Sequence, residues 1–183
     1  MNVHHMNRRE ALGYLTSIGS GIAIASTVDA TDTPSTAAPS DELSHHASAI
    51  HQEIFFNASP KRIYDALTTP AQFDAIVHFI SDIKLADKAS QISPDAGGAF
   101  LLFGGYIMGR HIELVPNMRL VQAWRTASWG SGLYSVVTFE LIDHGKGTQL
   151  IFDKKGFPES EGEHLNQGWH SHYWEPLDKY LSA

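Results

Sequence analysis

The sequence of 183 residues contains no cysteine. This absence excludes disulfide bonds, thiolate nucleophiles, iron–sulfur clusters and cysteine-ligated zinc. It leaves the redox compartment open, because a domain without cysteine folds equally well under oxidising and reducing conditions. Any chemistry of the chain must therefore come from other side chains.

Basic residues are also scarce, since 13 lysines and arginines stand against 20 acidic residues, for a formal net charge of -7. They form no basic stripe of the kind that binds phosphate backbones, so we expect no nucleic acid partner. Several catalytic motifs are missing as well, namely a glycine-rich dinucleotide fingerprint, a phosphate loop, a Gly-x-Ser-x-Gly elbow and His-Glu-x-x-His. These absences favour a binding protein over an enzyme.

The N-terminal segment combines charge, an apolar run and small residues in a fixed order. Arg8 and Arg9 precede the glycine-rich apolar run 11–25, and Ala30 lies at the −1 position of a small-residue cleavage site. This order is typical of a secretory signal, and the paired arginines resemble the bacterial twin-arginine type. The run is shorter than the roughly 20 apolar residues of a membrane span, which argues against a stable membrane anchor.

We therefore expect residues 1–30 to be a signal peptide that engages export machinery and leaves a periplasmic or secreted protein. The alternative is a cytoplasmic protein whose N-terminus is an amphipathic helix. Residues 31–49 are rich in Thr, Ser, Pro, Ala and Asp, and such a segment buries too little apolar surface to fold. We interpret it as a disordered linker to a folded domain at 50–183.

The domain alternates strand and helix patterns in a simple order. After a strand at 50–57, Ser59 and Pro60 predict a helix start, and Thr69-Pro70 predicts a break followed by a second short helix. Short breakers such as Gly104-Gly105 then separate further strands, so neighbouring strands should pair antiparallel. These strands are expected at 80–85, 98–103, 106–115, 119–126, 133–143 and 148–154.

A helix at about 161–181 closes the chain. Trp169, Tyr173, Leu177 and Leu181 recur at every fourth position and give it an apolar face, while Pro176 should kink it. We expect an α+β fold in which a curved antiparallel sheet of six to seven strands wraps around this helix.

This element order and several short motifs resemble the SRPBCC superfamily, also called START-like or helix-grip. Within it, the domain is similar to that of the activator of the 90-kDa heat-shock chaperone ATPase over nearly all of 50–181. The motifs are Leu67-Thr68-Thr69-Pro70, Gly97-Gly98-Ala99-Phe100, Glu113-Leu114-Val115-Pro116, Trp124-Arg125, Gly156-Phe157-Pro158 and Gln167-Gly168-Trp169.

The resemblance implies a helix-grip fold, and helix-grip domains often leave a cavity under the last helix. It does not fix the function, because most of the matching residues serve turns and packing. An export signal would separate the chain from a cytosolic chaperone, which argues against a chaperone partner. Three functions stay open: a binder of a small apolar or amphipathic ligand, a cyclase- or dehydratase-like enzyme, and a chaperone-activator-like interaction module.

Candidate catalytic residues lie in the strand 106–115. His111 and Glu113 are two residues apart, so strict alternation points them to the same face, where they could form an acid–base pair. Arg110 lies on the opposite face. The alternative is that the pair lies on a solvated sheet face and has no catalytic role.

Aromatic and apolar residues are the candidates for a ligand pocket, although they would equally make a filled core. His164, His170 and His172 do not have the spacing of a helical metal pair, and we expect neither a metal nor a cofactor. The candidate ligand-binding residues are Phe103, Trp124, Phe139, Trp169, Tyr173 and Leu177.

Overall fold

The computed structural model describes residues 49–80 and 88–183. The expected signal at 1–30 and the linker, apart from its last residue, lie outside the described residues, as does all but the first residue of the strand expected at 80–85. In the described part of the chain, no helix is both long enough and apolar enough to cross a membrane.

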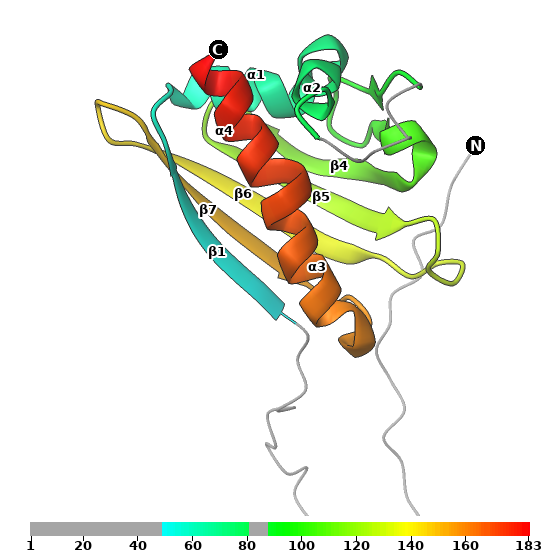
Figure 1. The fold of residues 1–183 in the computed structure, drawn as a ribbon. Coiled ribbons are helices and arrows are strands. Elements are labelled where there is room, and N and C mark those ends of the chain that lie inside the picture. Colours follow the sequence, from blue (N-terminus) through cyan, green and yellow to red (C-terminus); the bar gives the residue numbers. More distant parts are fainter. Residues whose placement is uncertain (1–48, 81–87) are drawn as a thin grey trace, which may run out of the picture. The chain divides into compact units, whose positions relative to one another are not determined.

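The strands form one antiparallel sheet in the order β1-β7-β6-β5-β4-β3-β2, seven strands in the part of the chain that is described. Figure 1 shows it as a curved layer crossed on one face by the C-terminal helix. The expected α+β architecture is confirmed. The strands are β1 (Ala49–Phe56), β2 (Gln91–Ile92), β3 (Ala99–Leu102), β4 (Ile107–Val115), β5 (Arg119–Thr126), β6 (Ser135–Asp143) and β7 (Thr148–Lys155).

Two short helices, α1 (Pro60–Thr68) and α2 (Pro70–Val77), follow β1 as expected. The Ser59 side chain accepts a hydrogen bond from the Arg62 amide at 3.3 Å, and Pro60 takes the first helical position, where its missing N–H is not needed. Thr69 is extended because it precedes a proline, and this ends one helix and begins the next.

The C-terminal helix consists of three parts: α3 (Gly162–Trp169), the π-helical segment η3 (His170–Trp174) and α4 (Glu175–Ser182). The Glu175 amide donates to the His170 carbonyl, five residues back, which widens the helix just before Pro176. The irregularity expected at this proline therefore takes the form of a π-helical turn.

The core lies between the sheet and this helix. The face of the sheet that the helix covers, called the inner face here, carries Trp124, Phe139 and Phe152, whose rings lie 4.3–6.0 Å from the Trp169 ring. Trp169 is 2% exposed and Tyr173 is 7% exposed. The helix thus turns its aromatic residues toward the sheet, as the spacing predicts.

Close packing explains one glycine in β4. A Cβ on Gly109 would lie 2.0 Å from the Ala123 carbonyl oxygen and 2.4 Å from the Phe100 ring. Phe100 pairs with Gly109 across the β3–β4 ladder, so its ring covers the glycine directly. Only a residue without a side chain fits there.

Candidate functional site

A cavity of about 190 Å³ lies between the inner face of the sheet and the first half of the C-terminal helix. It is partly open to solvent, and most of its wall is apolar. Because β4, β5 and α3 all contribute, the fold itself builds the cavity. Its lining residues are Phe103, Tyr106, Ile107, Trp124, Thr126, His164, Leu165, Gly168, Trp169, His172 and Tyr173.

Four of the six candidate ligand-binding residues line this cavity, namely Phe103, Trp124, Trp169 and Tyr173. Phe139 and Leu177 do not line it and are buried in the core, with exposed fractions of 2% and 1%. Phe139 packs against the Trp169 ring from the sheet side. Sequence spacing alone does not separate the wall of a cavity from the core behind it.

Phe103 has a backbone conformation that is uncommon for a bulky residue, with φ at 51°. The following glycines, Gly104 and Gly105, also have positive φ, and together they form the turn η1 (Phe103–Gly105) between β3 and β4. The turn aims the Phe103 ring at Phe73 and Tyr173, 5.5 and 5.6 Å away. Local strain here serves to place a ring in the cavity wall.

The polar groups of the cavity wall include Thr126, His164 and His172. The Nδ1 atom of His172 lies 3.2 Å from the Gly168 carbonyl oxygen, and because a carbonyl only accepts, Nδ1 must donate in this contact. In the neutral ring Nε2 is then the basic nitrogen. In the described ranges no three His, Asp or Glu side chains are grouped so as to hold a metal ion.

The structure does not bring the three candidate catalytic residues together. A β-bulge at Ile112 shifts the register, so that His111 pairs with Gln122 whereas Glu113 pairs with Val121. His111 therefore lies on the inner face and Glu113 on the outer face, and the expectation that they point the same way is wrong. Arg110 also lies outside, where it donates to the Gly97 carbonyl at 2.9 Å.

His111 is 1% exposed and does not line the cavity. Its ring lies 5.3 Å from the Phe100 ring, and its Nδ1 lies 3.5 Å from the Gln122 amide nitrogen. Burial lowers the pKa of His111, and the Ser93 backbone opposes this effect only in part. His111 is a neutral core residue, and Glu113 instead pairs with Arg119 at 3.7 Å.

Sequence reasoning missed the most unusual group, Lys154 of β7, which is 0% exposed. Its Nζ lies 3.1 Å from the centroid of the Trp124 ring and 5.4 Å from those of Trp129 and Trp169. We call these three residues the tryptophan cage. Two of its members, Trp124 and Trp169, also form part of the cavity wall.

The Lys154 amine has no hydrogen-bond partner among the described residues. Burial alone lowers its pKa from 10.5 to about 6, because an ammonium ion loses its hydration there without gaining a carboxylate. The amine is therefore largely neutral at pH 7. Strand alternation could have placed Lys154 inside, since Leu150 and Phe152 precede it on the same face, but two neighbouring charges make the segment look solvated.

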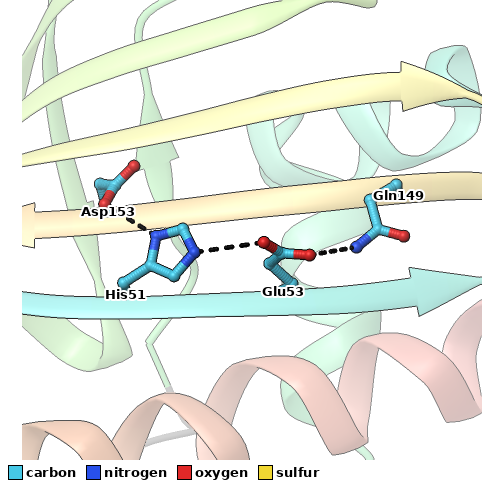
Figure 2. A network of polar contacts seen from close by, with 4 residues as sticks. All are labelled: His51, Glu53, Gln149 and Asp153. Atoms are coloured by element: carbon cyan, nitrogen blue, oxygen red, sulfur yellow. Dashed lines mark hydrogen bonds and ion pairs between the residues drawn. The ribbon is translucent and has the colours of Figure 1, made fainter.

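A separate polar cluster lies on the exposed side of β1 and β7, and Figure 2 shows its contacts. The Nδ1 of His51 lies 3.0 Å from Asp153 and its Nε2 lies 3.3 Å from Glu53, which accepts a further hydrogen bond from Gln149 at 2.9 Å. The Asp153 hydrogen bond first, and then that of Glu53, raises the pKa of His51. Solvent surrounds this cluster, so its contribution to stability is small.

Comparison with known proteins matches the domain to one family. The family described as Activator of Hsp90 ATPase homolog 1-like protein matches residues 57–182. The human protein named activator of 90 kDa heat shock protein ATPase homolog 1 is 31% identical over 122 residues, which are 67% of this chain and 33% of that protein. The Dictyostelium discoideum protein named activator of 90 kDa heat shock protein ATPase homolog is 31% identical over 115 residues, which are 62% of this chain and 28% of that protein.

Solved structures show the same fold at lower identity. An HSP90 activator from Plasmodium falciparum aligns with a TM-score of 0.64 and 21% identity, covering 73% of this chain and 96% of that one. The Aha1 dimer from Colwellia psychrerythraea aligns with a TM-score of 0.58 and 21% identity, over 73% of this chain and 95% of that one.

The chain spans about a third of the length of the curated relatives that it matches first. Their activities as whole proteins therefore do not transfer with the alignment. The family match itself covers more than half of the chain and includes the elements that build the cavity. The chain therefore belongs to the family of Activator of Hsp90 ATPase homolog 1-like proteins, with the helix-grip fold of the SRPBCC superfamily.

Proposed function

We propose that the domain binds a small apolar or amphipathic molecule in the cavity between the sheet and the C-terminal helix. The observation that carries this proposal is the cavity itself, whose wall combines aromatic rings with a few polar groups. Binding sites for small molecules generally have this composition, because apolar walls supply affinity and sparse polar groups supply orientation.

The volume limits the size of the ligand. At about 190 Å³ the cavity is somewhat larger than the roughly 150 Å³ dry cavity that is known to admit benzene, and smaller than the ~300–1,000 Å³ of pockets for drug-sized ligands. We therefore expect one aromatic ring with a short substituent, or a short aliphatic chain. Thr126, His164 and His172 would meet a polar end of the ligand.

The test uses toluene as a probe and Gly168 as the handle. Gly168 lines the cavity, and a Cβ there would meet only the His172 ring, at 3.9 Å. Gly168→Leu should therefore fill the cavity without disturbing the helix, while Gly162→Ala, at the start of the same helix and outside the cavity, is the control. We expect saturable binding of toluene by ligand-observed NMR in the wild type and the control, and none in Gly168→Leu.

Circular dichroism and thermal unfolding would show that the filled variant keeps its fold. Equal binding by Gly168→Leu and the wild type would place the probe elsewhere and refute the proposal. Native mass spectrometry of the protein purified from its own host should then show the adduct of the natural ligand.

We propose in addition that the chain acts outside the cytoplasm. The support is the ordered combination of Arg8, Arg9, the apolar run and Ala30 in the sequence. Replacing both arginines by lysine should leave the precursor in the cytoplasm of a bacterial host. Unchanged secretion of that variant would contradict a twin-arginine route.

A second candidate function follows from the family. The names of the human and Dictyostelium discoideum relatives describe activators of the 90-kDa heat-shock protein ATPase. Large apolar side chains that are exposed on this domain, such as Ile112 at 53% and Met118 at 63%, offer contacts for a protein partner. Steady-state ATPase assays with a purified 90-kDa chaperone test this candidate, and an unchanged rate at saturating concentrations of the domain would remove it.

A further inference from the structure

The buried amine of Lys154 lies directly behind the cavity. Trp124 and Trp169 both line the cavity, and the centroids of their rings lie 3.1 and 5.4 Å from the Lys154 amine. The amine therefore adjoins two rings of the cavity wall, although Lys154 itself does not line the cavity. Contact between the nitrogen and a ligand requires one of these rings to move aside.

Two of the rings that cover the amine make few polar contacts. The Trp129 indole N–H has no hydrogen-bond partner in the described part of the chain, and the Trp124 indole N–H has only the Tyr173 hydroxyl near it. By contrast, the Trp174 N–H donates to the Gln52 side chain at 2.5 Å, which fixes that ring. These two cage rings therefore lack the side-chain anchor that Trp174 has.

No carboxylate offsets the loss of hydration that burial imposes on the amine. β5, the segment after it and α3 face Nζ with the three indoles of the cage, and no charged side chain of the described residues pairs with it. Its pKa of about 6 leaves the lone pair free at pH 7. The titratable groups of the cavity wall are Tyr106, Tyr173, His164 and His172, and burial raises the pKa of Tyr173 so that its hydroxyl stays protonated.

We propose that Lys154 is a reactive amine that forms an imine with small carbonyl compounds bound in the cavity, an inference that rests on the proposed ligand-binding function. The lone pair of Nζ attacks the carbonyl carbon, and the carbonyl oxygen takes up a proton to give a carbinolamine. Loss of the hydroxyl and the remaining nitrogen-bound proton as water then leaves a C=N bond. No oxidant or reductant takes part.

The cavity defines the class of carbonyl compound. Its volume of about 190 Å³ admits an aldehyde or ketone with one ring or a short chain. The Tyr173 hydroxyl is buried in a residue of the cavity wall, and because the nearby Trp124 indole N–H can only donate to it, its own proton is available to a carbonyl oxygen. Carbonyl compounds thus provide an acceptor for a proton that no group of the described residues accepts.

The experiment traps the imine with benzaldehyde and sodium cyanoborohydride, followed by intact mass and peptide mapping. At pH 7 the neutral fraction of an amine with a pKa of about 6 exceeds that of an ordinary lysine by about a thousandfold. Even with restricted access, we expect Lys154 to be labelled at least ~10 times faster than the neighbouring, exposed Lys155. The rate at Lys154 should level off above pH 7, whereas that at Lys155 should keep rising with pH.

Two variants and one competitor give the controls. Lys154→Met should lose the fast adduct, and Lys155→Met should keep it. Toluene at saturating concentration should slow the labelling of Lys154 and leave that of Lys155 unchanged. If toluene binds but Lys154 is labelled no faster than Lys155, the imine proposal is wrong while ligand binding stands. Fast labelling of Lys154 that toluene does not slow refutes the route through the cavity, and failure of toluene to bind in the wild type refutes the ligand-binding proposal separately.

Discussion

Replacing Lys154 with methionine should stabilise the protein, although it removes a fully buried side chain. Methionine has a similar length, fills the same space between the indole rings and carries no charge to desolvate. In the wild type the unfolded chain gains a proton on this amine at neutral pH, whereas the folded chain excludes it. This difference favours the unfolded state.

The size of the effect follows from the pKa. Each pKa unit corresponds to about 1.4 kcal/mol, so a fall from 10.5 to about 6 destabilises the folded protein by up to about 5 kcal/mol at pH 7. Between pH 10.5 and pH 6 the unfolded state binds more protons, and stability rises with pH over this window. Below the folded-state pKa the penalty is constant, because both states are then protonated.

Urea denaturation at pH 6.5, 7.5 and 8.5 (steps of about 1 pH unit) measures the free energy of unfolding of the wild type and of Lys154→Met. Steps of about 1 pH unit resolve the expected slope of about 1.4 kcal/mol per unit. The advantage of the variant should shrink by that amount with each step toward alkaline pH. Lys155→Met, at an exposed site next to it, should show no such trend. A pH-independent difference, or a variant less stable than the wild type, would mean that the indole faces bind an ammonium ion. The Lys154 amine would then be protonated in the folded protein, contrary to this reasoning.

Three further predictions concern positions away from the cavity. Asp153→Asn should lower the pKa of His51, as measured by NMR titration, and an unchanged pKa would contradict the contact. In the wild type, the stability that this pair supplies is fully present below the ordinary histidine pKa and is lost as the pH rises through the raised pKa of His51. Gly109→Ala should lower the unfolding free energy by about 1–3 kcal/mol through overpacking, and a neutral effect in urea would argue against the close approach. Gln52→Ala should cost about 1–3 kcal/mol in the same measurement, because it leaves the Trp174 N–H buried without an acceptor, and unchanged stability would argue against this hydrogen bond.

Much of the fold is predictable because local signals and burial agree. Pro60 and Pro70 fix the starts of two helices, and the expected strand at 119–126 coincides with β5. The spacing of Trp169 and Tyr173 gives the buried side of the last helix. In each case a local pattern agrees with the burial that the fold requires: a proline at a helix start, a strand-like run between turns, or a four-residue repeat.

The site is less predictable, because it depends on exceptions to those patterns. A single extra residue in β4 separates His111 from Glu113, and alternation contains no signal for such a bulge. Lys154 follows an aspartate and precedes another lysine, a composition typical of a solvated strand end, yet it is buried. Its burial depends on tryptophans from β5, from the segment after β5 and from α3, which no local window contains.

The widened turn in the last helix has a consequence for how the chain tolerates length changes. A π-helical turn contains one residue more than the α-helical turn that it replaces, and each α-helical residue corresponds to a rotation of about 100°. Deleting one residue between His170 and Trp174 would therefore restore regular winding and swing Leu177 and Leu181 away from the core while α3 stays in place. The extra residue of the π-helical turn keeps the apolar sides of α3 and α4 facing the same core. A deletion of one residue should therefore be tolerated poorly in this segment.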